Sequence, residues 1–493
     1  MRPHDLVSHL GAWSAGKGPL QRKLAHALLQ AIRHGALNPG IRLPSERDLA
    51  DALTVSRTTV VAAYNALREG GWVESRTGSG TWVSRSGVVA AARGGAQARA
   101  LAASPLLGLL SAHDAQDLVD LVLGAPLPLS GLPLDLFTLP PEEYGALVND
   151  HRYYPLGLPA LRQAIASYYV KAGLATRPEQ ILVTTGAQQG ISLCAGLYLQ
   201  RGDSALVEDP TYFGVLDAFR AAGARIAGVA IEAQGVSPAT LRQRIIATSS
   251  RLVYLTPTFQ NPTGSLMPRV ARKEVARIAA DLGVPIIDDC TLFDLALEGS
   301  PPPPIAAFAP DAPVITLGSL SKLIWPGLRI GWVRAPQTIV ERLVRLKSAI
   351  DLGCPLLTQA IAVRLLGEID VVRKLRRQQL KLRRDLLAAL LCEHLPDWKF
   401  RVSSGGLFLW VKLPAGDARE LAQTALRHGV VILPGPVMSG TGLYAGFIRI
   451  PFIAEPESLR TGIRRLAAAW RDYLSGPRGT TAIVEQHLGM VHC

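Results

Sequence analysis

The 493-residue chain is poor in cysteine and has no long uninterrupted apolar segment. Its five cysteines are scattered, and none belongs to a CxxC pair or a Cys/His cluster. Neither a disulfide framework nor a metal site is therefore expected. No segment approaches the roughly 20 apolar residues needed to cross a bilayer, and the N-terminus lacks the apolar core of a signal peptide. Together these absences predict a protein of the reducing cytoplasm without membrane contact.

Charged residues are also sparse at 18%, whereas hydrophobic residues make up 48%, which is typical of a globular chain rather than a disordered one. A chain of this length is expected to form two or three domains. The charge that is present is unbalanced, because lysine and arginine exceed aspartate and glutamate and give a net charge of +13. Such an excess suggests a polyanionic partner but does not identify it.

Residues 1–85 show three helical patterns followed by a β-hairpin. In "LPSERDLADAL", Ser45 is a good N-cap, and Asp48 occupies the capping-box position three residues later. In "TVSRTTVVAAYNALREGG", Ser56 is the next N-cap, ahead of an amphipathic stretch. "WVESRTGSGTWV" consists of two β-prone runs around a Gly-rich turn. This order of elements predicts a winged helix-turn-helix domain, mainly helical, of the α+β class.

The second helix of this unit begins with hydroxyl and guanidinium donors, at the end where a recognition helix meets base edges and phosphates. The alternative is a small helical interaction module with ordinary solvated arginines. The stretch from "LPSERDLADAL" to "GTWV" resembles the DNA-binding domain of the GntR regulator family across nearly its whole length. By that resemblance, the residues that contact double-stranded operator DNA are Arg47, Ser56, Arg57, Thr58 and, on the wing, Arg76.

Beyond the hairpin the organisation changes twice. Residues 86–117 are rich in Ala and Gly without an amphipathic face, which predicts a flexible linker. Residues 118–474 alternate β-prone runs such as "SALVED" and "VPIIDD" with helical segments, which predicts an α/β domain with a mostly parallel sheet. A smaller α+β domain is expected over about 360–474. It begins with a long basic helix, which we interpret as a solvated face rather than a second DNA surface. Residues 475–493 are expected to be a disordered tail.

Several loops at the expected carboxyl ends of strands carry chemistry. "TTGAQQG" opens a helix whose N–H groups can hold a phosphate, and "QNPTG" exposes the amide of Asn261. "IIDD" places Asp288 and Asp289 after a buried run, so one of them should meet a cation. "SLSK" ends at Lys322, and Arg329 follows seven residues later.

These groups together fit pyridoxal 5'-phosphate. A partly desolvated lysine forms a Schiff base with the aldehyde of this cofactor, helped by a depressed pKa. A carboxylate keeps the pyridine nitrogen protonated, and an amide hydrogen-bonds the ring hydroxyl. The candidate phosphate cradle comprises Gly186, Ala187, Gln188, Ser319 and Arg329.

Residues 118–474 also resemble the fold-type I aminotransferases. The resemblance implies that Lys322 is the Schiff-base lysine, Asp289 the partner of the pyridine nitrogen, and Asn261 and Arg329 the partners of the ring hydroxyl and the phosphate. It further implies the following roles for four more positions: Tyr212 stacks on the ring, Arg449 holds an effector carboxylate, and Tyr153 or Tyr154 reaches the phosphate of a neighbouring subunit.

A GntR-like head on an aminotransferase-like body is the layout of the MocR-type regulators. That resemblance implies a cytosolic, head-to-tail homodimeric transcription factor that senses the cofactor, or an amine or amino acid, through aldimine formation. One departure concerns Leu292, where relatives usually carry a tyrosine that contacts the ring oxygen. Its loss favours sensing over turnover. The alternatives are a working aminotransferase with an accessory head, and a cofactor-free dimerisation scaffold, against which the retained site residues argue.

Overall fold

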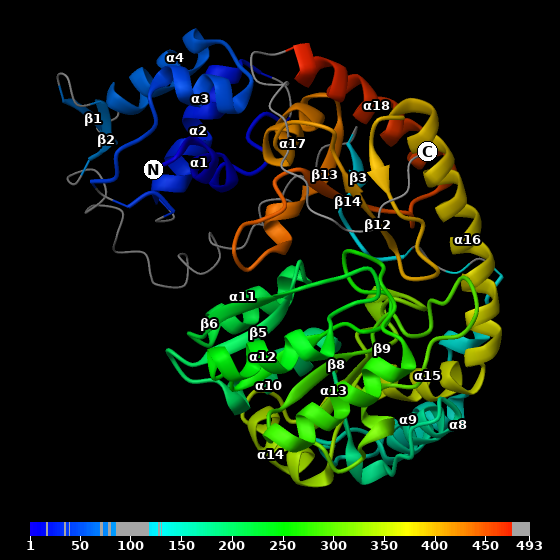
Figure 1. Cartoon of the computed structure of the whole chain (residues 1–493). Coiled ribbons are helices and arrows are strands. Elements are labelled where there is room, and N and C mark those ends of the chain that lie inside the picture. The colour runs from blue at the N-terminus through cyan, green and yellow to red at the C-terminus, as the bar shows by residue number, and fades with distance from the viewer. Residues whose placement is uncertain are drawn as a thin grey trace.

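The computed structural model describes residues 1–15, 18–33, 36–38, 40–69, 72–76, 80–84, 118–126, 129 and 131–475. The expected linker, 86–117, lies outside these residues, as does the expected tail apart from its first residue. The described chain forms a head, a small domain beside it and a large domain below both (Figure 1).

The described part of the head has a helix-turn-helix and a hairpin. Its elements are α1 (Pro3–His9), α2 (Leu20–Arg33), α3 (Glu46–Leu53), α4 (Arg57–Glu69), β1 (Val73–Arg76) and β2 (Gly80–Val83). The Ser45 hydroxyl accepts from the Asp48 N–H at 3.1 Å, and the Ser56 hydroxyl accepts from the Thr59 N–H at 3.2 Å, so both expected caps are confirmed. The strands β1 and β2 pair antiparallel as the wing. The winged helix-turn-helix is therefore confirmed, with α1 as an unexpected addition.

The large domain is built on a seven-stranded sheet. Its strands, in spatial order, are β4 (Ile181–Thr184), β10 (Gly331–Arg334), β9 (Val314–Ser319), β8 (Ile286–Asp289), β7 (Leu252–Leu255), β5 (Ser204–Asp209) and β6 (Arg225–Ala230). The strand β10 runs antiparallel to both neighbours, whereas the other pairs are parallel. The mostly parallel sheet expected from the alternating pattern is thus confirmed.

Successive strand residues enter two apolar layers, one on each face of the sheet. Leu252 and Tyr254 join the layer formed with α10 (Ala187–Tyr198), α11 (Phe213–Ala221) and α14 (Gln337–Ser348). Val253 and Leu255 join the opposite layer, which includes α9 (Pro159–Lys171), α12 (Pro238–Thr248) and α13 (Arg269–Leu282). Burial on both faces explains why the strands are continuous apolar runs. The helices α8 (Pro141–Val148) and α15 (Leu356–Gly367) pack against each other at the edge of the domain.

The small domain has a five-stranded sheet and three helices. The strand order is β11 (Lys399–Phe400), β12 (Phe408–Lys412), β14 (Phe447–Pro451), β13 (Val430–Pro434) and β3 (Val119–Leu121), and the helices are α16 (Ile369–His394), α17 (Ala418–Arg427) and α18 (Pro456–Ser475). The strand β3 pairs parallel to β13. The expected start of this domain near residue 360 therefore misses one strand, because a three-residue strand carries almost no periodic signal.

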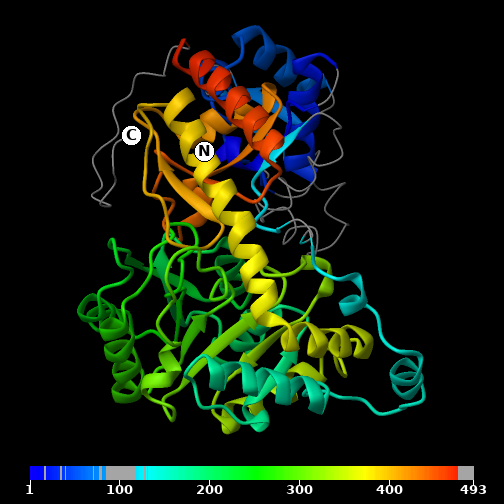
Figure 2. The same ribbon diagram turned by 90° about the vertical axis from the view of Figure 1, so that its right-hand side faces the viewer.

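The long basic helix α16 spans from the large domain to the small one (Figure 2). The solvated face expected from the sequence is only partly present, since Arg377 is exposed but other arginines are not. Arg376 is fully buried and donates to the backbone oxygens of Leu323 and Ile324, and Arg384 is 3% exposed and donates to that of Ser403. For these two arginines the interpretation was wrong, because the planar guanidinium can satisfy several buried carbonyl oxygens at once. The arginines fasten the helix to both domains.

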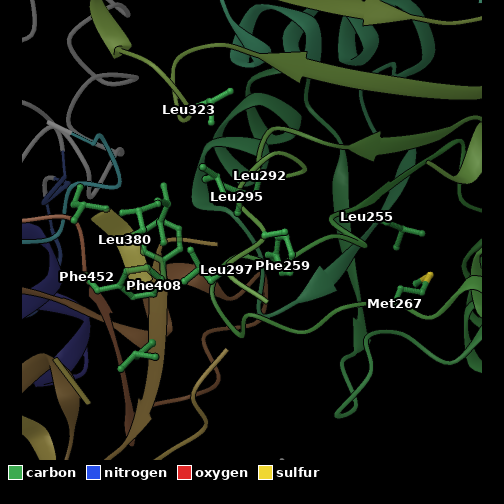
Figure 3. Packing of buried hydrophobic residues seen from close by; sticks show 14 of the residues in the cluster. Leu255, Phe259, Met267, Leu292, Leu295, Leu297, Leu323, Leu380, Phe408 and Phe452 are labelled. Carbon is green, nitrogen blue, oxygen red and sulfur yellow. The ribbon is translucent and has the colours of Figure 1, made fainter. Parts of the chain in front are cut away.

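An apolar cluster joins the two domains next to the loop that contains Lys322. Figure 3 shows it seen from close by. Large-domain residues Leu292 and Leu323 belong to the same buried cluster as Leu380 of α16 and Phe408 of β12. Loops at the ends of the large sheet are thus held against the small sheet by packed side chains.

Three features bear on compartment and metals. None of the described helices is long and apolar enough to cross a membrane. In the described parts of the chain, no group of three or more His, Cys, Asp or Glu side chains could hold a metal ion. Among the described cysteines, Cys194, Cys290 and Cys354 are free, buried thiols, whereas Cys392 is disulfide-bonded.

Candidate functional site

A cavity of about 240 Å³ lies between the ends of the large-domain strands and the small domain. It brings together all the cofactor and effector residues expected from the sequence. These are Gly186, Ala187, Gln188, Tyr212, Asn261, Asp289, Ser319, Lys322, Arg329 and Arg449. Leu292 lines the same cavity, and its side chain is buried.

One end of the cavity has the character of an anion site. The helix α10 begins there after Gly186, whose φ of +129° is a conformation that residues with a Cβ rarely adopt. A Cβ on Gly186 would lie 3.2 Å from Nη2 of Arg329. The Ser319 hydroxyl donates to the Ile330 oxygen, whereas the buried Ser321 hydroxyl has no partner in the structure. Helix N–H groups, hydroxyls and a guanidinium around a space kept open by glycine suit a phosphate.

Lys322 follows β9 and extends along the cavity wall. Its Nζ donates to the backbone oxygen of Gly124 at 2.7 Å. Burial, together with the nearby positive charge of Arg449, lowers the pKa of Lys322 to about 8. An appreciable share of the amine is therefore unprotonated and nucleophilic near neutral pH.

The two carboxylates of "IIDD" have different surroundings. Asp288 is fully buried away from the cavity, where it accepts from the Ile305 N–H at 2.8 Å. Burial raises its pKa, although the charge of Arg272 opposes this. Asp289 lines the cavity and accepts from the Tyr254 hydroxyl at 2.5 Å. The aspartate chosen by resemblance is thus the one at the cavity.

Arg449 of β14 supplies a buried cation on the small-domain side. Its Nη1 donates to Oδ1 of Asn261 at 3.1 Å, and its guanidinium carbon lies 4.1 Å from the centre of the Phe408 ring. Burial lowers the pKa of Arg449 to about 9, and its Nε has no hydrogen-bond partner. Burial also raises the pKa of Tyr212 to about 12. The site therefore holds a cation with one unpartnered N–H beside Asn261 and Lys322.

Tyr153 and Tyr154 do not line the cavity of the single chain. The side chain of Tyr153 is 73% exposed, and the Tyr154 hydroxyl donates to Asp150 at 2.6 Å. Three residues that do line the cavity were not expected from the sequence: Ser321, Tyr254 and Phe408. The signal for Ser321 was present in "SLSK", whereas Phe408 comes from a different domain and Tyr254 depends on strand register.

The DNA-contact candidates lie at one end of the helix-turn-helix. Arg47, Ser56, Arg57 and Thr58 are all exposed. The Ser56 hydroxyl accepts from the Thr59 N–H and shares hydrogen bonds with the hydroxyls of Thr58 and Thr59. Arg76 ends β1, where its backbone pairs with Gly80, and its side chain lies outside what the structure describes.

The head contacts the small domain through α17. Arg427 donates to the backbone oxygen of Leu53 at 3.1 Å and to the Thr54 hydroxyl at 3.2 Å. These two residues form the turn between α3 and α4. Ala12 of the head also packs against an apolar cluster that includes Phe213 of the cofactor cavity. A continuous set of contacts thus runs from the cavity to the head.

Comparison with known proteins matches both parts of the chain. Residues 139–466 match the family "Aminotransferase class I and II", and residues 20–83 match "Bacterial regulatory proteins, gntR family". The chain is 29% identical to the HTH-type transcriptional regulator YdfD of Bacillus subtilis, over 93% of this chain and 98% of YdfD. It is also 29% identical to the probable rhizopine catabolism regulatory protein MocR of Rhizobium meliloti, over 92% and 94% of the two chains.

The chain belongs to the MocR-type branch of the GntR regulators. The body of this MocR-type regulator is also similar to the structure of LysN, the α-aminoadipate aminotransferase of Thermus thermophilus, solved with N-(5'-phosphopyridoxyl)-L-leucine. The TM-score is 0.68 at 28% identity, covering 78% of this chain and 98% of that one.

The cofactor of this fold is pyridoxal 5'-phosphate, and the residues present fit it. The cavity offers an unpartnered Ser321 hydroxyl and a glycine beside Arg329, which suit a phosphate, and a lysine amine and a carboxylate, which suit an aldehyde and a ring nitrogen. The MocR-type chain is therefore a transcriptional regulator that binds pyridoxal phosphate.

Proposed function

We propose that the body of this regulator senses pyridoxal phosphate itself, or a small amine or amino acid, and thereby sets the affinity of the head for operator DNA. The observation that supports this most is that a complete cofactor cavity is linked by packed side chains to the head. The proposal divides the chain into the head, 1–85, a linker, 86–117, and the sensing body, 118–474, with a tail beyond it.

Each cavity residue has a proposed part in holding the cofactor. Asp289 faces the ring nitrogen, Asn261 the ring hydroxyl, and Tyr212 one face of the ring. Gly186, Ala187, Gln188, Ser319 and Arg329 hold the phosphate. When bound, the cofactor supplies an aldehyde that condenses with amines, and Lys322 presents its partly unprotonated amine to it.

Arg449 is the proposed partner of an effector carboxylate. It is a buried cation with an unpartnered Nε, held between Asn261 and the Phe408 ring. Its two terminal nitrogens donate to Asn261 and to the backbone oxygen of Val122, so a carboxylate entering the cavity would gain a charge-assisted hydrogen bond from the free Nε. The favoured effector is therefore an amino acid or an amine that also bears an acid group.

For the DNA complex we propose that Arg57 and Thr58 meet base edges and that Arg47 and Ser56 meet the backbone. Arg76 of the wing is proposed to reach an adjacent groove. The exposed N-terminal end of α4 and the net charge of +13 support these roles. Binding of DNA places the regulator in the cytoplasm.

A homodimer is the proposed functional unit. Tyr153, Ile350, Leu352 and Trp325 are large apolar or aromatic side chains that stay exposed in the single chain. Their loops adjoin, since a Cβ on Gly353 would lie 2.9 Å from the backbone of Tyr154. Exposed apolar patches of this kind mark protein interfaces. In a head-to-tail dimer, a neighbouring Tyr153 or Tyr154 would reach the phosphate.

Transamination is the second candidate function, because Lys322, Asp289, Asn261 and Arg329 are all assembled. Leu292 opposes it, since it places an apolar wall where relatives carry a phenol. The deciding experiment is a titration of operator DNA with the purified protein, repeated with and without pyridoxal phosphate and candidate amino acids, alongside an assay for released keto acid. A ligand-dependent change in DNA affinity without multiple turnovers supports the sensor. Rapid turnover with unchanged DNA affinity supports the enzyme.

A further inference from the structure

The hydroxyl of Tyr254 reaches the carboxylate that faces the cofactor cavity. It donates to Oδ2 of Asp289 at 2.5 Å, while the Thr291 N–H donates to Oδ1 at 2.9 Å. Tyr254 is 1% exposed and Asp289 is 4% exposed. Both oxygens of the carboxylate therefore have a protein donor, independently of any bound cofactor.

The register of the sheet accounts for this contact. The strands β7 and β8 are parallel, and Tyr254 lies beside Ile287. Side chains alternate along a strand, so Asp289 shares the face of Ile287, one step further along. A long side chain reaches such a diagonal neighbour. Thr256 adds a second constraint, because its hydroxyl lies 3.4 Å from the Tyr254 oxygen.

The phenol is fixed as a donor. Burial and the neighbouring charge of Asp289 raise the pKa of Tyr254 well above its usual value, so the hydroxyl keeps its proton. Removing one donor from a buried carboxylate leaves one of its oxygens unsatisfied. Tyr254 therefore fixes the direction of the Asp289 carboxylate.

We propose that Tyr254 is a positioning residue of the cofactor site, whose phenol holds Asp289 as an aligned carboxylate for the ring nitrogen of pyridoxal phosphate. This inference rests on the proposed role of Asp289. It has particular weight in this chain because Leu292 supplies no polar group, so the tyrosines that line the described cavity are Tyr212 and Tyr254.

The test uses full-length Tyr254→Phe, which keeps the ring and removes only the hydroxyl. The matched control is Tyr168→Phe, because the Tyr168 hydroxyl also donates to a buried carboxylate, that of Asp294, at 3.0 Å and outside the cavity. Asp289→Asn and the double variant complete a double-mutant cycle. The dissociation constant of pyridoxal phosphate is measured for each apo-protein between pH 6 and 8.5, and thermal unfolding of each apo-protein checks the fold.

Tyr254→Phe is expected to weaken cofactor binding about tenfold at pH 7, the low end for a hydrogen bond to a charged group. In the Asp289→Asn background the same change should have an effect under about twofold, as should Tyr168→Phe.

Two outcomes overturn the inference: an unchanged affinity for Tyr254→Phe, or an equal loss in the wild-type and Asp289→Asn backgrounds. A different failure concerns the proposed function itself. If Asp289→Asn alone leaves cofactor affinity unchanged at every pH, Asp289 is not the partner of the ring nitrogen.

Discussion

Arg427 of α17 donates a hydrogen bond of 3.1 Å to the backbone oxygen of Leu53. Leu53 ends α3, and the recognition helix α4 begins four residues later. The small domain, which also carries Arg449, therefore holds the head at the turn that orients its DNA-reading helix. If the small domain moves around a bound effector, the turn between α3 and α4 is expected to move with it.

Removing the contact between Arg427 and Leu53 should weaken the coupling between the effector cavity and the DNA-binding head. Arg427→Ala is expected to leave cofactor binding intact but to shrink any effector-dependent change in operator affinity, whose typical range is about 5- to 150-fold. The physical reason is that the turn loses its charged link to α17. Operator titrations with and without effector measure this. Arg464→Ala, which removes an exposed arginine from α18, is the control for charge. An undiminished response in Arg427→Ala would show that coupling takes another route.

The lowered pKa of Lys322 should affect both the attachment of the cofactor and the stability of the apo-protein. Covalent attachment of the cofactor needs the neutral amine, so its rate should rise about tenfold per pH unit below pH 8 and level off above it. Lys322→Ala should abolish attachment, seen as loss of the yellow colour and of label fixed by borohydride. A rate independent of pH between 6 and 8 would contradict the depressed pKa.

The same shift predicts a pH-dependent stability of the apo-protein. The folded pKa of Lys322 is about 8 against an unfolded value of 10.5, so the unfolded chain binds more protons between these values. The free energy of unfolding should therefore rise with pH across that window. At pH 7, where the charged lysine is buried at full cost, Lys322→Met should stabilise the apo-protein by at most about 3 kcal/mol. Denaturant unfolding at pH 7 and pH 10 compares the two proteins, and a larger gain at pH 10 would reverse the sign of the argument.

Whether a feature of the fold or the site could be predicted from the sequence depends on how far apart in the chain the interacting residues lie. Strand runs such as "LVYL" are continuous and apolar because both faces of the sheet are covered, so they could be predicted. Lys322, Asp289 and Asn261 follow such runs directly, and their meeting at one edge of the sheet follows from its parallel order. Local signals were sufficient there.

Contacts between residues that are far apart in the sequence could not be predicted. The burial of Arg376 depends on carbonyl oxygens more than 50 residues away, and a basic helix looks the same in sequence whether its arginines meet water or backbone. The contact of Tyr254 with Asp289 depends on the register of two strands 35 residues apart. The docking of Arg427 on Leu53 joins positions 374 residues apart. No periodic pattern encodes such pairings.

The two arginines proposed to meet DNA should behave differently. Arg57→Ala should cost about 1–3 kcal/mol on the operator if its guanidinium reads a guanine, and much less on random DNA. Arg47→Ala should weaken all sequences alike and reduce the slope of log affinity against log salt by about one, because it neutralises one phosphate. Salt-dependent binding to operator and scrambled duplexes separates these effects. Equal losses for both variants on both duplexes would mean that neither residue reads bases.

The effector response should depend on Arg449 in a way that identifies its partner. Arg449→Ala removes a buried cation whose Nε is unpartnered, so an effector with a carboxylate should lose its influence on DNA binding, whereas an amine without an acid group should keep whatever influence it has. The cofactor should still attach, because Lys322 remains, and effector-free DNA binding should change little, because α4 is untouched. Linkage also requires reciprocity: operator DNA must change the effector's affinity by the same factor as the effector changes that of DNA. Paired titrations in both directions, on wild type and Arg449→Ala, measure both factors. Unequal factors in the wild type would mean that the titrations did not reach equilibrium, and an intact response to acidic effectors in Arg449→Ala would assign the carboxylate to another residue.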